Sequence, residues 1–177
     1  MNAAPSDVII RSARPNDAAR VARLLALRGI TVEEALEQAP RMIDALPVLL
    51  LASLPAGDVE AAGDDDAAAP VALSGAFVLP GDLQEGRPER WMVSGLIVDP
   101  GARRRGIGHT LLAAVGAAVQ EIEPGEDLFS VVETANHASV AAHLAAGFEE
   151  AAHVDGYAGL VFDGDALLMR RPGDSVQ

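Results

Sequence analysis

The sequence predicts a mixed α/β fold whose first half is antiparallel. Short apolar runs typical of strands alternate along the chain with segments whose apolar residues recur at helical spacing. Half of the 177 residues are apolar, so the chain can bury a core and is not expected to be globally disordered. The predicted order is strand, two helices, three strands, helix, strand, helix and two strands, within one domain over residues 1–177.

The first half of the chain places two helices between its first and second strands. Residues 8–11 form the first apolar run, and a turn at 14–17 leads into a helix over residues 18–28. A second helix is predicted over residues 32–43, interrupted near Pro40 because proline lacks the N–H that a helix interior needs. Strands follow at residues 48–53 and 71–78. The acidic, low-complexity segment between them, residues 55–69, is predicted to be a mobile loop.

The second half continues with a strand and a long helix. Residues 91–98 predict a strand, and helical periodicity then runs from Ile107 to about Glu121, before Pro124 and Gly125. Residues 128–132 predict the next strand, and Asn136 is a candidate N-cap for a helix over residues 137–146. Apolar runs that begin at residue 148 and span 157–161 and 166–170 predict the late strands.

The charge of the chain excludes several classes of partner. The net charge is −13, and all thirteen basic residues are arginine. A chain this acidic lacks the broad basic surface that nucleic acid requires, and anionic membranes would repel it, so neither is an expected partner. There are no cysteines, so a thiolate nucleophile and a cysteine metal site are excluded. The first residues show no basic region followed by an apolar core, and a cytoplasmic location is expected.

The loop between the strand at residues 91–98 and the long helix has the chemistry of an anion site. It reads Asp-Pro-Gly-Ala-Arg-Arg-Arg-Gly-Ile-Gly-His over residues 99–109. The first N–H groups of a helix lack internal partners, glycines let a ligand approach the backbone, and arginines add positive charge. A Walker A loop is excluded because the chain has no lysine, and a dinucleotide fingerprint fails because Leu111 occupies its third glycine position. A phosphate loop and a simple solvated turn stay as alternatives.

Two segments resemble the GNAT superfamily of N-acetyltransferases. Arg103, Gly106 and Gly108 occupy the defined positions of its acyl-CoA-binding signature, Gln/Arg-x-x-Gly-x-Gly/Ala. The segment that begins at Asn136 and contains His143 has the spacing of the family's Asn-x-x-Ala-x-x-x-Tyr-x-x-x-Gly-Phe segment. The resemblance implies a GNAT-like acyltransferase fold: a central, mixed and mostly antiparallel sheet of about seven strands, splayed between the fourth and fifth and flanked by about four helices.

The resemblance also implies acetyl-CoA as co-substrate, with no metal. The pantetheine arm of the cofactor would enter the splayed gap, and its pyrophosphate would bind backbone N–H groups at the start of the long helix. The cofactor-binding residues that follow are Leu96, Ile97, Val98, Arg103, Arg104, Arg105, Gly106, Ile107, Gly108, His109 and Asn136. Simple N-capping is an alternative role for Asn136, and the two roles are compatible.

The implied reaction is transfer of an acetyl group to a primary amine by direct attack in a ternary complex. His143 stands where the family usually has a tyrosine that protonates the leaving thiolate, and an imidazolium is a competent acid near neutral pH. A surface or core histidine without catalytic role is the alternative. Glu133, at the end of the fifth strand, is the candidate base, with a solvated strand end as the alternative and Ser94 as a weaker candidate. Trp91 is expected either beneath the acceptor or in the core.

The acceptor amine stays open between a small molecule and a peptide, and the acidic surface suits a cationic one. Two other functions are alternatives: an N-terminal protein acetyltransferase, and a non-catalytic acyl-CoA-binding or regulatory domain. The missing tyrosine and the absence of a carboxylate from residues 91–98 favour the non-catalytic domain. Many members of the family dimerise, so a homodimer and a monomer are both open.

Overall fold

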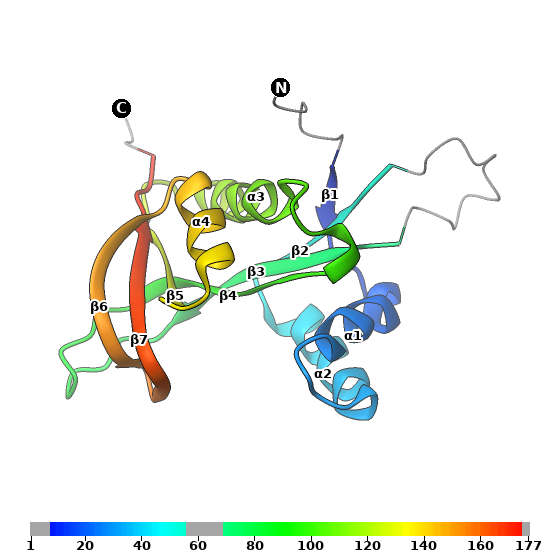
Figure 1. The fold of residues 1–177 in the computed structure, drawn as a ribbon. Coiled ribbons are helices and arrows are strands. Elements are labelled where there is room, and N and C mark those ends of the chain that lie inside the picture. The colour runs from blue at the N-terminus through cyan, green and yellow to red at the C-terminus, as the bar shows by residue number, and fades with distance from the viewer. Residues whose placement is uncertain (1–7, 56–68, 175–177) are drawn as a thin grey trace, which may run out of the picture.

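A computed structural model describes residues 8–55 and 69–174. Its centre is a seven-stranded sheet in the order β1-β2-β3-β4-β5-β7-β6 (Figure 1). The strands are β1 (Ile9–Ser12), β2 (Val48–Ser53), β3 (Ala72–Leu79), β4 (Arg90–Val98), β5 (Leu128–Glu133), β6 (Glu149–Tyr157) and β7 (Leu160–Arg171). The α-helices are α1 (Ala18–Ala26), α2 (Val32–Ala45), α3 (Ile107–Ile122) and α4 (His137–Ala145). Among the strands of the described residues, only β4 and β5 pair in parallel, so the predicted mixed and mostly antiparallel fold is confirmed.

Helices cover both faces of the sheet (Figure 1). On one face, α1 and α2 pack against β2, β3 and β4, where Leu24 of α1 belongs to the same buried cluster as Leu51 and Ile97. On the other face lies α3, whose Leu111 and Val115 are fully buried. Helix α4 packs beside α3 over the second half of the sheet. The start of α3 is thereby placed at the end of β4, between the two halves.

Helix α2 is more continuous than the sequence predicts. It begins with a reciprocal cap in which Thr31 Oγ1 accepts from the Glu34 N–H at 3.2 Å and the Glu34 carboxylate accepts from the Thr31 N–H at 2.8 Å. The helix then runs through Pro40 to its end, so the predicted interruption is wrong. Ala35 and Ala39 are fully buried, and this tertiary packing outweighs the one backbone hydrogen bond that a proline removes.

The C-terminal part forms two strands, as in the predicted element order, and the three apolar runs of the sequence fall on one hairpin. Residues 157–161 are the tip of the β6–β7 hairpin, with Tyr157 opposite Leu160. Ala158 and Gly159 between them have φ of +50° and +83°, as in a two-residue type I′ turn. The apolar run suggests a strand of its own, but it lies at a solvent-exposed hairpin tip, where Val161 is 87% exposed. The correct reading is one long hairpin.

The sheet opens between β4 and β5. The two parallel strands are paired only at Trp91↔Leu128 and Met92↔Phe129, near the start of each strand. Beyond these two pairs, β4 stays with β3 and β5 stays with β7. The predicted splay between the fourth and fifth strands is therefore present, and it leaves one edge of β4 without a neighbouring strand.

A bulge bends β4 where it leaves β5. Ser94 and Gly95 together stand opposite Gly75, between the regular pairs on either side. Gly95 has φ +121°, a conformation that residues with a side chain rarely adopt. Its carbonyl accepts a hydrogen bond of 2.8 Å from Ser74 Oγ. The bulge thus turns β4 toward the loop that follows it.

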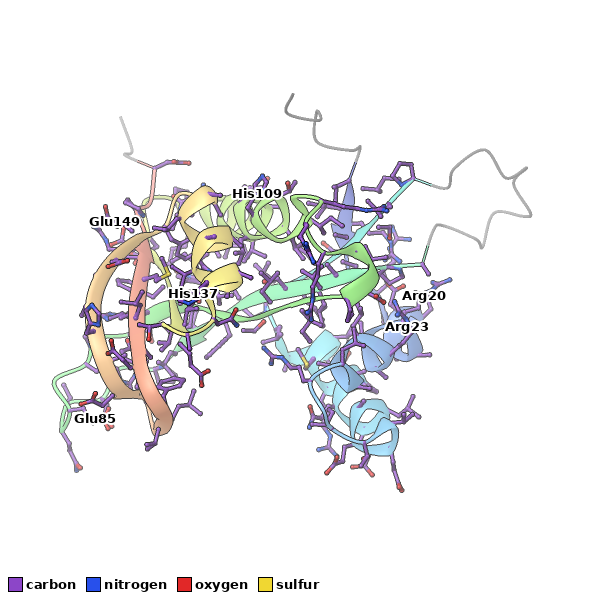
Figure 2. All side chains as sticks on the ribbon, in the orientation of Figure 1. Arg20, Arg23, Glu85, His109, His137 and Glu149 are labelled. Atoms are coloured by element: carbon purple, nitrogen blue, oxygen red, sulfur yellow. The ribbon has the colours of Figure 1, made fainter. Side chains whose placement is uncertain are left out.

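The acidic segment at residues 55–69 lies, apart from its two end residues, outside the described part of the chain. The start of β3 lies beside the end of β4, where the Asp99 N–H donates to the Val71 carbonyl at 2.8 Å. Arg23 of α1 reaches this corner (Figure 2), where its guanidinium donates a hydrogen bond to the Pro70 carbonyl. Among the helices of residues 8–55 and 69–174, none is long and apolar enough to cross a membrane.

Candidate active site

The loop after β4 is held in place by a carboxylate at its start. The 3-10 turn η2 (Pro100–Ala102) follows Asp99, whose side chain accepts from the Gly101 N–H and from Arg23 Nη1, each at 3.0 Å. The Arg23 guanidinium is the main cause of a pKa of Asp99 below its ordinary value. Asp99 is therefore engaged as a structural anion. Arg103 donates from Nε to the Val98 carbonyl at 3.3 Å, and no carboxylate of the described residues forms a salt bridge with the three arginines that follow Asp99.

Helix α3 begins without a side-chain cap. Its N-cap, Gly106, has φ +76° and no side chain to cover the first amides. The first helical bond in this turn joins the Thr110 N–H to the Gly106 carbonyl at 3.2 Å. Within the described residues, the backbone N–H groups of positions 104–109 have no hydrogen-bond acceptor. Several unpaired N–H groups at the positive end of a helix make a site for phosphate oxygens.

A cavity of about 680 Å³ opens in front of these amides. A Cβ built on Gly108 would lie 3.3 Å from Leu96 Cδ2 and 3.6 Å from Ala142 Cβ, so the missing side chain keeps the space between β4, α3 and α4 open. The lining residues are Leu96, Val98, Ala102, Arg103, Arg104, Gly106, Ile107, Gly108, His109, Asn136, Ala138, Ser139 and Ala142. An extended ligand with a phosphate at one end fits this shape and chemistry.

Two of the predicted cofactor-binding side chains do not reach this cavity. Ile97 is buried on the opposite face of the sheet, in the cluster with α1, and Arg105 is exposed outside the lining. The Asp99–Val71 hydrogen bond fixes the alternation along β4, so the backbone of Ile97 faces β3 while the backbone groups of Leu96 and Val98 face the gap. The sequence could not show which of Leu96, Ile97 and Val98 face the gap, because the side chains of all three are apolar.

Asn136 performs the local role that the sequence predicts and also lines the cavity. Its Oδ1 accepts from the Ser139 N–H at 3.1 Å, which caps α4. Its backbone N–H donates to the Glu133 carbonyl at 2.9 Å, so the cap is tied directly to the end of β5. The exposed amide at this corner stands where the splayed strands and α4 meet.

A second cavity of about 220 Å³ shares Leu96, Asn136 and Ser139 with the first. The remaining lining residues are Arg28, Val93, Gly95, Ser130, Val131, Val132, Glu133, His143 and Phe162. The shared residues lie in the gap between β4 and β5, so the two spaces meet there. One elongated molecule in the first cavity can present its end to a smaller molecule in the second.

His143 is a buried, doubly hydrogen-bonded residue with 2% exposure. Its Nδ1 lies 2.8 Å from the Ser139 carbonyl, which can only accept, so we assign the ring proton to Nδ1. Its Nε2 lies 2.9 Å from Ser130 Oγ and accepts from that hydroxyl. Burial lowers the pKa of His143, and the bond to Ser139 opposes this only in part. A resting imidazolium acid near neutral pH, the premise taken from the sequence, is therefore not what this environment favours.

Of the other catalytic candidates, one lines the second cavity and two do not. Glu133 lines the second cavity at the exposed end of β5. Ser94 lies outside the lining of that cavity. Trp91 is 4% exposed, and its Nε1 donates to the Glu123 carboxylate at 2.8 Å. Of its two expected places, beneath the acceptor or in the core, it occupies the core. Glu133 is the carboxylate of β5 that remains available for chemistry.

Three residues of the second cavity were missed from the sequence. Ser130 lies between Leu128 and Val132 on the inward face of β5, and the pattern gave no sign that it meets a histidine. Arg28 follows the end of α1, where an arginine usually is solvated, and Phe162 belongs to the late hairpin. The available signal was that Ser130, a polar residue, lies two residues from both Leu128 and Val132 and therefore on the same face of the strand.

A model of the acetyltransferase (GNAT) family matches residues 35–148. Among curated protein sequences, none matches the chain significantly. Similar solved structures include yncA from Salmonella typhimurium with its cofactor acetyl-CoA, at a TM-score of 0.66 and 16% identity, covering 97% of each chain.

A phosphinothricin acetyltransferase from Sinorhizobium meliloti in complex with acetyl-CoA has a TM-score of 0.65 at 18% identity, covering 94% of this chain and 88% of that one. Aminoglycoside acetyltransferase AAC(6')-Ib, in complex with coenzyme A and kanamycin, has a TM-score of 0.65 at 19% identity, covering 94% and 95%. At these identities the likeness shows the fold.

Proposed function

The chain belongs to the acetyltransferase (GNAT) family, and on that premise we propose that it is an acetyl-CoA-dependent N-acetyltransferase acting on a primary amine. The observation that carries the proposal is the junction of two cavities in the gap between β4 and β5, one of them facing the uncapped start of α3. Family relatives of the same fold hold acetyl-CoA or coenzyme A. A molecule with a phosphate end and an acyl end matches the first cavity.

The residues present fit acetyl-CoA. The unpaired N–H groups of positions 104–109 would bind the pyrophosphate, with Arg103 and Arg104 supplying positive charge beside it. The gap-facing backbone groups of Leu96 and Val98 would pair with the amides of the pantetheine arm. The thioester would then lie near Asn136, where the two cavities meet. When bound, the cofactor supplies the activated acetyl group.

The amine in the second cavity would attack the thioester carbonyl directly in a ternary complex. A new N–C bond forms, the C–S bond breaks, and the thiolate leaves. Glu133 would take a proton from the ammonium, directly or through a water, so that the nitrogen lone pair is free to attack. The proton on the nitrogen of the tetrahedral intermediate must then move away, and the thiolate must gain one.

For this second transfer we assign His143 as a relay that is neutral at rest. Ser130 donates to His143 Nε2, so a proton that arrives on Ser130 can pass to the ring. The burial that lowers the pKa of His143 makes the resulting imidazolium more acidic than an ordinary one. Its Nε2 proton would return through the Ser130 hydroxyl to the leaving thiolate, because Nδ1 faces the Ser139 carbonyl. In this proposal His143 receives a proton before it gives one, unlike a tyrosine acid.

The non-catalytic alternative rests on the missing tyrosine, and the N-terminal protein acetyltransferase alternative on relatives that act on protein. One similar structure is the ribosomal-protein-S18-alanine N-acetyltransferase from Escherichia coli. The second cavity beside Glu133 favours turnover of a small amine over both. A homodimer, if formed, would use the free edge of β6, which pairs with β7 on one side only.

The test is release of coenzyme A thiol from acetyl-CoA in the presence of polyamines, amino sugars, amino acids and short peptides. Turnover with at least one amine, and no turnover without an amine, is expected. Binding of acetyl-CoA without turnover on any amine would favour the non-catalytic domain, and failure to bind acetyl-CoA would overturn the proposal.

A further inference from the structure

The second cavity contains an arginine for which the proposed chemistry has no use. Arg28 follows α1 and lies against the bulge of β4. A Cβ on Gly95 would overlap Nη2 of Arg28 and would lie 3.1 Å from Cζ and 3.2 Å from Nη1. The guanidinium therefore rests on the surface that the missing side chain of Gly95 leaves free. The bulge creates this seat, since its φ of +121° also disfavours any residue larger than glycine.

Arg28 differs from the two arginines of α1, the helix that precedes it. Arg23 donates to Asp99 and to the Pro70 carbonyl, and Arg20 lies 3.3 Å from Asp17. Arg28 makes no ion pair or hydrogen bond with any residue that the structure describes. A guanidinium on a cavity wall without a carboxylate offers its donors to a ligand with planar oxygens.

Glu133 lines the same cavity and, within the described residues, makes no side-chain hydrogen bond or ion pair either. The cavity thus has one unneutralised cation and one unneutralised anion that are not paired with each other. Its volume of about 220 Å³ admits a small molecule. Val93, Leu96 and Phe162 add apolar surface for the skeleton of such a molecule, while Arg28 and Glu133 are themselves exposed.

Resting on the proposed function, we propose that the acceptor is a small amino acid: a primary amine with a carboxylate on the same short skeleton. The Arg28 guanidinium holds the carboxylate, and Glu133 receives the ammonium before it loses its proton. A polyamine would suit the net charge of −13 but would place a second cation against Arg28. The local charges of the cavity, and not the charge of the whole surface, select the substrate.

The experiment compares each amino acid with its own carboxamide, which keeps the amine and removes the anion. The probes are glycine, L-alanine, L-methionine, L-glutamate, β-alanine and γ-aminobutyrate, each assayed with acetyl-CoA by thiol release. For at least one pair, kcat/KM of the acid is expected to exceed that of the amide by about 10- to 100-fold, the range of a charge-assisted hydrogen-bond pair. Arg28→Met should reduce that ratio to near one, and Arg28→Lys should restore part of it.

Arg41→Met is the matched control, because Arg41 is an exposed arginine of α2 outside the lining of the cavity. This variant should keep the wild-type ratio. A ratio near one in the wild type, or a ratio that survives Arg28→Met, would overturn the inference while leaving an acetyltransferase of other amines intact.

A binding measurement separates this inference from the proposed function. The same amino acids are titrated calorimetrically into protein saturated with coenzyme A. Binding that weakens about 10-fold or more in Arg28→Met supports the amino-acid site even if no acetyl transfer occurs. If no amino acid binds and none is acetylated, the site does not exist as proposed.

Discussion

The two cavities that meet between β4 and β5 are built from different parts of the chain. The larger one is formed by one continuous stretch from Leu96 to His109, completed by α4, and its proposed ligand contacts are mostly backbone groups. The smaller one combines residues of β4, β5, α4 and β7 with one residue that follows α1, and Arg28, Glu133 and His143 are among them. A backbone site tolerates changes of side chain but not obstruction, whereas a side-chain site depends on each group.

The largest effect is expected from obstruction of the backbone site. Gly108→Trp would fill the space between Leu96 and Ala142 and should weaken binding of acetyl-CoA by about 100-fold or more, because the ligand loses its place beside the amides. Calorimetry measures the affinity, and circular dichroism checks the fold. Gly164→Trp is the control, since a Cβ at Gly164 meets no atom within 4 Å. Retained affinity in Gly108→Trp would assign the ligand to another place.

The next effect concerns a single side chain of the smaller cavity. Glu133→Gln should lower kcat by about 100-fold, the usual contribution of a positioned general base, and should leave the affinity for acetyl-CoA unchanged. Steady-state kinetics and calorimetry give the two quantities. Glu150→Gln, at an exposed position of β6, should leave both at the wild-type value. A loss of cofactor affinity in Glu133→Gln would remove the distinction between the two cavities.

A smaller effect is expected when a side chain is removed from the backbone site. Arg103→Met should weaken acetyl-CoA binding by about 10-fold at low salt and by less at high salt, because the backbone amides stay in place while one positive charge is lost. Arg105→Met should have little effect, since Arg105 is exposed outside the cavity lining. Affinities of both variants at two ionic strengths check this. Equal losses in the two would mean that only the charge of the loop matters.

The smallest effect is on stability. Burial lowers the pKa of His143 in the folded protein below its value in the unfolded chain, so the unfolded chain binds the proton more readily. Stability should therefore fall as the pH is lowered from about 6.5 through the folded-state pKa, and the contribution is fully present above about 6.5. His143→Gln should flatten this part of the curve. Urea unfolding between about pH 5 and 8 compares the two proteins, and parallel curves would contradict the assignment.

What the sequence could predict follows the same division between the cavities. A local motif suffices for the larger one, because Arg103, Gly106 and Gly108 lie in one turn at a helix start, where geometry follows from the chain itself. The order of helices and strands along the chain was predicted from periodicity, and the splay between the fourth and fifth strands from the family resemblance. Arg28 and Ser130 could not be placed, since their meeting with Gly95 and His143 depends on tertiary packing between elements far apart in the sequence.

Errors in the fold have equally local causes. The helix interior tolerates Pro40 because Ala35 and Ala39, which precede it, are buried in the cluster that α2 shares with α1 and the sheet, a contribution that no local propensity contains. The run at residues 157–161 is apolar without being buried, so hydropathy alone assigned the turn of the hairpin to a strand. The protonation of His143 depended on how deeply α4 is packed, which composition and spacing do not reveal.

The short pairing between β4 and β5 has a mechanical consequence. The sheet consists of two slabs, β1 to β4 and β5 to β7, that share only two residue pairs at one end. A pantetheine arm that pairs with the free edge of β4 would serve as a borrowed strand and complete the interrupted ladder. Binding of acetyl-CoA would then make the boundary between β4 and β5 more rigid, and release of coenzyme A would make it more mobile again.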